Sequence, residues 1–352
     1  MYYVIAVLAF GLLIAIHELG HFFAAKLMGV RVIEFAIGMG PKLLKKQGKE
    51  TLYTLRALPF GGFCAMEGED SAIDDERAFT SQKRWKRAVI LLAGSAANFI
   101  AAFIIIVIII AGANSFVGTT VTSLPPTYTS DSEQSLMVGD TIVSVNGERL
   151  FYSQDFFMFM NLSRGGGAEL VVRRDGEINN LSLERREFIE NGEVVYRFGL
   201  TGITFNEISA TFAEQMRYSF YTAFNFVRLI RVSLVQLISG YAGLGDLAGP
   251  LGIVNAMNDI AQQSPSVGDA IENIVFFTAF IAVNLSVMNL LPIPALDGGR
   301  ILFLGISWFI EKVIRRKLDP KYEGYIHAGA MVLLFGLMFF VLFNDVINII
   351  NP

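Results

Sequence analysis

Two histidines and a glutamate, His17, Glu18 and His21, lie within an otherwise apolar stretch, IAIHELGHFFAAK, near the start of the chain. On a helix, residues i and i+4 share one face, so the two imidazoles can meet a single metal ion while Glu18 lies about 100° round the helix. Zinc peptidases use this HExxH spacing, in which two histidines hold the ion and the carboxylate takes a proton from the attacking water. The motif therefore predicts a hydrolytic zinc site.

A catalytic zinc site usually has three protein ligands and one water, so the motif lacks one ligand. The candidates are Asp297 and His327. At about 1.5 Å per helical residue, His21 lies about 8 Å from Lys26, the first basic residue after it. On the same scale Asp297 lies about 5 Å from Arg300. His21 and Asp297 therefore lie at a similar depth, measured from the basic residue that follows each of them. Depth alone does not exclude His327.

The sequence around Asp297 favours it as the third ligand. The stretch NLLPIPALDGGR places two prolines before it, which break a helix, and two glycines after it, which free the backbone. Broken helices at membrane depth are tolerated where they are buried or line a polar cavity, and they often build sites there. Asp297 is therefore the predicted third ligand, and His327 is predicted to pack at a helix interface.

The helices that hold these residues are predicted to cross a membrane. The chain has 352 residues, of which 53% are hydrophobic and 17% charged, and this is too apolar for an ordinary soluble domain. Four stretches are long and apolar enough to span a bilayer, at residues 1–25, 88–113, 273–296 and 324–344. The segment 205–245 is also apolar, but charged residues interrupt it, which favours amphipathic helices on the outer surface over a fifth span.

Basic residues assign the sides of the membrane. Lys and Arg collect between the first and second spans and between the third and fourth, and none precedes residue 26 or follows residue 321. Cytoplasmic loops carry this excess, so both termini and the long segment 114–272 are predicted to lie on the outer side of the membrane. The net charge of -4, without a long basic run, argues against a nucleic acid as a partner, whereas the apolar spans predict the lipid bilayer as one.

The motif HELGH at 17–21, together with NLLPIPALDGG at 289–299, resembles the site-2 protease family and most closely its bacterial regulator-of-sigma-E protease type. The resemblance spans almost the whole chain, with weaker motifs in GSAANF (94–99) and GPLGI (249–253). It implies an intramembrane zinc endopeptidase with one Zn²⁺ per chain. His17, His21 and Asp297 would hold the ion, and Glu18 would be the catalytic base. Asn289 would form a hydrogen bond with the substrate backbone near the metal.

The resemblance also implies a membrane-re-entrant β-hairpin after the first span, at about residues 31–65. The stretches VRVIEFAIGMG and TLYTLRALPFGGF support it, because they are rich in β-branched and aromatic residues and end in glycines. A strand edge near lipid is costly unless paired, so an unwound substrate is predicted to add to it as a strand. An ordinary cytosolic hairpin is the alternative.

The outer segment 114–204 resembles one PDZ domain, since VGDTIVSVNGERL has strand alternation around an Asn-Gly turn and is followed by further strand-like stretches. The preceding PPTYTSDSEQSLMVGD lacks the small-residue run usual in this family, which favours a filter against large ectodomains over a peptide sensor. The predicted organisation is therefore 1–113 with two transmembrane helices and the hairpin, 114–204 PDZ-like, 205–270 amphipathic helices outside, and 271–352 with the last two transmembrane helices.

The predicted fold class is a polytopic α-helical membrane protein with four transmembrane helices, and the predicted substrate is a single-span membrane protein already trimmed by a site-1 protease. An anti-sigma factor or a signal-peptide remnant would fit. A metal or solute transporter is one alternative, but the chain has only three histidines and no visible repeat. A membrane-anchored PDZ adaptor is another, and it leaves the buried His and Glu residues without a purpose.

Overall fold

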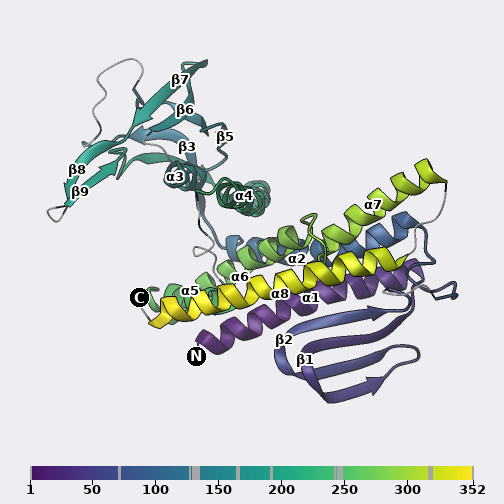
Figure 1. Ribbon diagram of the computed structural model, residues 1–352. Coiled ribbons are helices and arrows are strands. Elements are labelled where there is room, and N and C mark those ends of the chain that lie inside the picture. Colours follow the sequence, from purple (N-terminus) through teal and green to yellow (C-terminus); the bar gives the residue numbers. More distant parts are fainter. Residues whose placement is uncertain are drawn as a thin grey trace. The chain divides into compact units, whose positions relative to one another are not determined.

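The computed structural model describes residues 2–69, 73–126, 128, 135–163, 167–190, 193–241, 243, 249–315 and 320–350. The chain divides into two compact units. The helical unit comprises Met1–Ile109 and Phe226–Pro352, and the sheet unit comprises Ile110–Asn225. Figure 1 labels the elements of both units.

The helical unit contains the elements that hold the predicted site. Its helices are α1 (Tyr2–Met28), α2 (Arg84–Ile110), α5 (Pro250–Gln262), α6 (Val267–Asn289), α7 (Asp297–Ile314) and α8 (Pro320–Ile350). The short helix α5 packs against α1, α6 and α8, and α1 also contacts α6. The helices α1, α2, α6 and α8 overlap the four predicted spans, and each is long and apolar enough to cross a membrane.

The segment 205–245 forms one strand and one continuous helix. Strand β10 (Thr204–Ser209) comes first, and the 27-residue helix α4 (Phe212–Ile238) follows, with the boundary between the two units at Asn225 within it. Among the described residues, α4 is the fifth helix that could cross a membrane by length and composition, and it is the least apolar of the five. The number of helices that do cross the membrane, predicted as four, stays a prediction.

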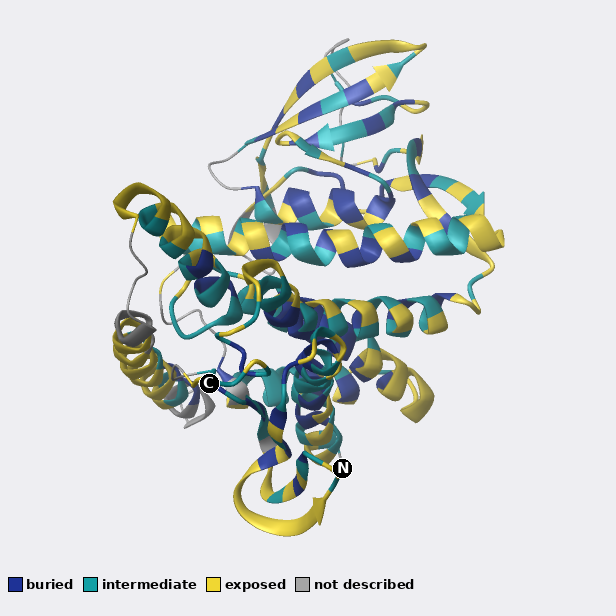
Figure 2. Cartoon of the chain, turned by 90° about the vertical axis from the view of Figure 1, so that its right-hand side faces the viewer, coloured by how far each residue is buried: buried dark blue, intermediate teal, exposed yellow. Residues whose placement is uncertain are grey.

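The surface of the helical unit carries many large apolar side chains. Exposed residues recur along its helices, and they make up most of the described part of α8 (Figure 2). Examples are Ile104 and Ile108 on α2, and Val332, Leu333 and Phe339 on α8, all of them more than half exposed. Apolar surface of this extent is unfavourable in water, whereas the hydrocarbon of a bilayer covers it without cost. The helical unit thus has the surface of a membrane protein.

The predicted hairpin is present as a bent pair of long antiparallel strands, β1 (Val32–Gln47) and β2 (Leu52–Met66). Residues 32–37 pair with 62–66 on one side and with 52–55 on the other, and residues 44–47 pair with 52–55. The two strands therefore build four rows, with residues 62–66 at one edge. The two outer pairings are antiparallel, whereas residue numbers rise together where 32–37 meets 52–55, so these two central rows run parallel. The bends fall at Gly38, Gly40 and Gly61, whose positive φ angles glycine adopts without strain.

The turn of the hairpin is tied to the end of α1. The carboxylate of Glu50 forms ion pairs with Arg77, at 2.8 Å, and with Lys26. The hydrogen bonds from Arg77 and then Lys26 hold the pKa of the Glu50 carboxyl at about 2. The hairpin therefore has a fixed anchor near the end of the helix that carries the HExxH motif.

The break after α6 occurs where the two prolines predicted it. Helix α6 begins at a Ser266 cap, whose hydroxyl accepts the Asp269 N–H, and it ends at Asn289. An irregular stretch follows, and α7 begins at Asp297. A Cβ added to Gly298 or Gly299 would collide with backbone carbonyls of this stretch, so only glycine lets the first turn of α7 approach it so closely. The observed helix thus ends at Asn289, before the carboxyl end of the predicted span 273–296.

A buried carboxylate links the last helix to the start of α5. Asp345 on α8 is only 5% exposed, and it accepts the N–H groups of Gly249 at 3.1 Å and Gly252 at 3.0 Å. The first amides of a helix have no acceptor within the helix, so a side chain from elsewhere can cap them. The GPLGI segment therefore has a structural role at this contact.

Replacing Asp345 with alanine should leave those two amides without an acceptor and destabilise the protein by about 1–2 kcal/mol. Thermal unfolding in detergent measures this as a lower Tm. Asp259→Ala, which removes an exposed carboxylate from α5, is the matched control and should leave Tm unchanged. Equal Tm values for the two variants would rule out the capping role.

The sheet unit is built on antiparallel strands in the order β10-β3-β4-β6-β7, with β5 paired to β4. Its further elements are β3 (Ser115–Ser123), β4 (Thr141–Val145), β5 (Glu148–Arg149), α3 (Ser153–Leu162), β6 (Gly167–Arg174), β7 (Glu177–Glu184), β8 (Arg186–Glu190) and β9 (Glu193–Arg197). The predicted Asn-Gly turn is confirmed, since Asn146 and Gly147 both have positive φ between β4 and β5. Strand β10 joins this sheet beyond the predicted boundary at residue 204.

Candidate metal centre

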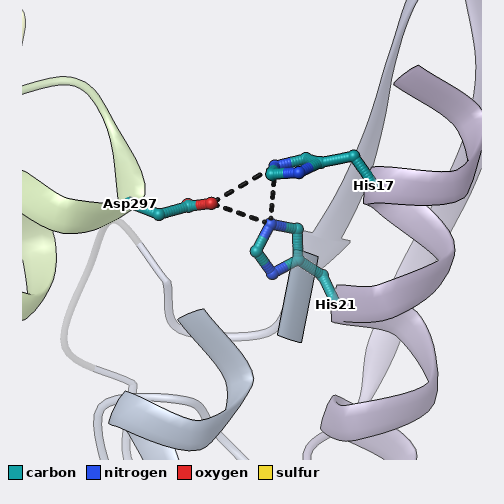
Figure 3. Close-up of side chains that lie close together, drawn as sticks. All are labelled: His17, His21 and Asp297. Carbon is teal, nitrogen blue, oxygen red and sulfur yellow. Dashed lines mark hydrogen bonds and ion pairs between the residues drawn. The ribbon is translucent and has the colours of Figure 1, made fainter. Parts of the chain in front are cut away.

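The three predicted ligand residues meet inside the helical unit. His17 and His21 lie on successive turns of α1, and Asp297 faces them from the first turn of α7 (Figure 3). The two Nε2 atoms are 3.1 Å apart, and each lies 3.2 Å from Oδ2 of Asp297. Both imidazoles are buried. Within the described part of the chain, this is the one group of three or more His, Cys, Asp or Glu side chains that are arranged to hold a metal ion.

The spacing of these atoms fits a zinc ion. Tetrahedral bonds of about 2.0–2.1 Å place two ligand atoms about 3.3 Å apart, close to the 3.1 and 3.2 Å observed. Oδ2 of Asp297 is buried and makes no hydrogen bond of good geometry among the described residues, although it lies 3.2 Å from each Nε2 and buried polar atoms normally have a partner. A site of two imidazoles and one carboxylate also matches the ligand types of catalytic zinc. The residues present therefore fit the metal.

The backbone of α2 orients one of the two imidazoles. Nδ1 of His21 lies 2.8 Å from the carbonyl oxygen of Ile90, so Nδ1 carries the proton and donates it there. This leaves the lone pair of Nε2 free to face the metal position. Ligand histidines usually have such an outer partner, which fixes both the tautomer and the ring orientation.

Close packing between α1 and α2 depends on two glycines. Gly20 of α1 lies against the backbone carbonyl of Ala93, and Gly94 of α2 lies against both imidazoles. A Cβ on Gly94 would come within 2.7 Å of Cε1 of His21 and 2.8 Å of Cε1 of His17. Small residues at helix contacts in membranes allow this approach. Gly94 therefore leaves the room that the two rings occupy.

Replacing Gly94 with alanine should push the imidazoles out of register and weaken zinc binding by about 10-fold or more. Zinc content after dialysis against a graded series of chelator concentrations measures the loss. Gly305→Ala provides the matched control, because a Cβ at that position on α7 meets nothing within 4 Å. Unchanged zinc affinity in the Gly94 variant would contradict this steric account.

The cluster of His17, His21 and Asp297 lines a cavity of about 640 Å³. Glu18 lies in its wall beside the ligands, and its carboxyl has the backbone of Cys64 as a hydrogen-bond partner. The edge row of the hairpin, residues 62–66, forms another part of the wall. Arg300 and Glu69 form an ion pair in the same wall. The cavity thus joins a carboxylate, the cluster and a strand edge in one space.

Asn289 also lies at this cavity. It is the last residue of α6, and its Nδ2 lies 3.4 Å from Nε2 of His17. The structure therefore brings all five predicted site residues together. His327 belongs to α8, but its side chain lies outside the described residues. The sequence did not predict the contact of Gly94 with the imidazoles or the hydrogen bond to the Ile90 carbonyl. Gly94 is the first residue of the GSAANF segment, which is only a weak family motif.

The known proteins that are similar to this chain are named as proteases. The profile of peptidase family M50 matches residues 5–337. A protein named as a zinc metalloprotease from Clostridium acetobutylicum is 36% identical over 349 residues, which cover 99% of this chain and 98% of that protein. One from Clostridium perfringens is 34% identical, with 99% of both chains covered. The regulator of sigma-W protease RasP from Bacillus subtilis is 27% identical, with 97% of both chains covered.

Apolar helices that bring a His-His-Asp cluster beside a glutamate define a membrane metalloprotease. The chain belongs to peptidase family M50, the site-2 protease family that its two motifs resemble. It is therefore a zinc-dependent membrane protease, and the transporter and adaptor alternatives do not describe its family.

Proposed function

We propose that this protein is an endopeptidase that cleaves single-span membrane proteins within the bilayer, with His17, His21 and Asp297 as its zinc ligands. The observation that supports this most is the triangle of ligand atoms, 3.1 to 3.2 Å on each edge, inside an apolar helical unit. Charged and polar groups at membrane depth are expensive, so a function that requires all three accounts for their presence there.

Glu18 is the proposed general base. Zinc bound at the site acts as a Lewis acid and lowers the pKa of the attacking water towards about 7. The Glu18 carboxylate, in the same cavity wall, takes the proton from that water and returns it to the nitrogen of the leaving amine. Asn289, next to His17, donates a hydrogen bond to the substrate backbone and so positions the scissile bond.

The edge row 62–66 is the proposed docking site for the unwound substrate. This row pairs with residues 32–37 on one side, and its residues line the cavity. A transmembrane helix must unwind before it can be cut, and its freed amides and carbonyls then need partners in a medium without water. Pairing with a strand edge satisfies them. The substrate would thereby lie along the cavity that holds Glu18.

The proposed membrane layout follows the four predicted spans, with α1, α2, α6 and α8 crossing a bacterial plasma membrane and both termini outside. The hairpin of about residues 31–65 re-enters the membrane. Its exposed apolar side chains, among them Leu43, Leu44 and Leu58, support this placement over a cytosolic hairpin. Water reaches the metal from the cytoplasmic side, where the basic residues collect.

The sheet unit contains the proposed extracytoplasmic PDZ-like domain, residues 114–204, which excludes substrates with large ectodomains. Helices in 205–270 follow it outside the membrane, and 271–352 carries the last two spans. The alternative role is peptide sensing. A cavity of about 450 Å³ in the sheet unit, lined by Phe156, Phe157 and Phe198 among others, is the feature that favours this alternative.

The proposed substrates are anti-sigma factors, or signal-peptide remnants, that a site-1 protease has already trimmed. The name of the Bacillus subtilis relative, regulator of sigma-W protease, supports the first class. The test is cleavage in proteoliposomes of a single-span substrate, with and without a folded ectodomain. Only the trimmed form should be cut, and a zinc chelator should stop the reaction until zinc is restored. Zinc-independent cleavage, or ion flux without cleavage, would exclude the proposal.

A further inference from the structure

Asn98 on α2 is a buried amide without a partner. Its side chain is 0% exposed, and within the described part of the chain neither Oδ1 nor Nδ2 has a hydrogen-bond partner. Nearly all buried polar side chains in folded proteins have at least one partner. An amide with two unsatisfied atoms in an apolar helix bundle therefore requires an explanation outside the resting chain.

The position of Asn98 links it to the catalytic cavity. It is one of the residues that line the cavity holding His17, Glu18 and Asp297. It also lies four residues after Gly94, the residue in contact with both imidazoles, and therefore on the same face of α2. One helical turn separates the two positions by about 6 Å along the axis.

The chemistry of an amide restricts what it can receive. A side-chain amide offers donors on nitrogen and an acceptor on oxygen, and its complement is a group with one donor and one acceptor. A peptide group of an extended chain has both, and the substrate must expose such groups when it unwinds. Apart from the Cys64 thiol, which is only a weak hydrogen-bonding group, the other polar side chains of the cavity have partners or assigned roles: the ligand cluster, Glu18, Asn289 and the Arg300–Glu69 pair.

We infer that Asn98 binds the backbone of the unwound substrate, through hydrogen bonds from Nδ2 to a peptide carbonyl and from a peptide N–H to Oδ1. Gly94 contacts both imidazoles and so marks the level of the metal position on α2, and Asn98 lies about 6 Å from it along the helix axis. An extended chain rises about 3.3 Å per residue, so the peptide group that Asn98 binds lies about two residues from the scissile bond. Asn98 is thus a positioning residue and does not touch the reacting atoms. This inference rests on the proposed intramembrane endopeptidase function.

The inference separates substrate binding from stability and from the metal. Since the amide has no partner within the described chain, Asn98→Leu, which has a similar size, should not lower Tm and should leave the zinc content unchanged. Two lost hydrogen bonds should raise KM by about 10- to 100-fold, and kcat should change little, because the lost contacts are made equally before and during the reaction. Asn98→Ala should behave in the same way.

The experiment uses the full chain in nanodiscs and a fluorescein-labelled Leu/Ala-rich transmembrane peptide of about 20 residues. Peptide affinity is measured by anisotropy in a Glu18→Gln background, and KM and kcat are measured without that change. Ser95→Ala is the matched control: Ser95 is equally buried on α2, its hydroxyl has no partner among the described residues, and it is not among the residues that line the cavity. It should keep the wild-type affinity.

Weaker peptide binding in both Asn98 variants, with unchanged Tm and zinc, is the expected result. Unchanged affinity, or a fall in Tm or in yield in both variants, would overturn the inference, since the amide would then serve the fold or a structural water. Failure of the proposed function is distinguishable from either result, because the protein without substitutions would then not cut the peptide at all.

Discussion

Replacing Glu18 with glutamine is expected to lower kcat by about 10²- to 10⁴-fold while the protein keeps its zinc. Glutamine has nearly the same shape, so the neighbouring ligands His17 and His21 remain in place, but a neutral amide cannot take a proton from water. Cleavage of a single-span substrate and metal analysis of the same preparation measure the two quantities side by side.

The matched control for this prediction is Glu272→Gln, which makes the same change at an exposed position on α6. It should leave both activity and zinc unchanged. Near-normal cleavage by the Glu18 variant would remove Glu18 from the mechanism. Loss of zinc from that variant would instead show that the carboxylate supports the metal site.

Replacing Asp297 with alanine is expected to remove most of the zinc from the purified protein. Its Oδ2 lies 3.2 Å from Nε2 of both histidines and completes the triangle around the metal position. A direct ligand should contribute more than an outer partner, whose loss typically costs about 10- to 100-fold in metal affinity. Metal content and a chelator competition titration measure the effect, and His17→Ala should behave similarly.

His327→Ala is the matched comparison for Asp297, because the sequence offered His327 as the other candidate ligand. It should retain about one zinc per chain. Zinc retained in the Asp297 variant but lost in the His327 variant would reverse the ligand assignment. Such a result would place α8, in place of the first turn of α7, at the metal.

The two halves of the site could be predicted from sequence because each signal is local, and the prediction that they meet rests on their similar depth and on the family resemblance. The spacing of His17 and His21 places both on one face of a helix whatever surrounds it. Pro292 and Pro294 end α6, and Asp297 begins α7 directly afterwards, as two prolines followed by glycines indicate. The role of these residues in binding zinc stays a proposal that rests on their geometry.

Other features depend on contacts between distant parts of the chain, which local patterns do not encode. The four rows of the hairpin arise because residues 32–37 pair on both sides, with several shifts of register that alternation alone does not reveal. Strand β10 joins the sheet through β3, the first strand of the same unit, although most of that unit's sequence lies between the two strands. Likewise, the contact of Gly94 with the imidazoles depends on how α1 packs against α2.

The hydrogen bond from His21 ends on the main-chain oxygen of Ile90 and not on a side chain. Every amino acid at position 90 supplies the same oxygen, provided that the helix keeps its path. Mutational drift there can therefore alter the residue and leave the support of the ring intact. Alanine scanning would pass over this contact, whereas a change that bends α2, such as a proline one turn further on, would expose it.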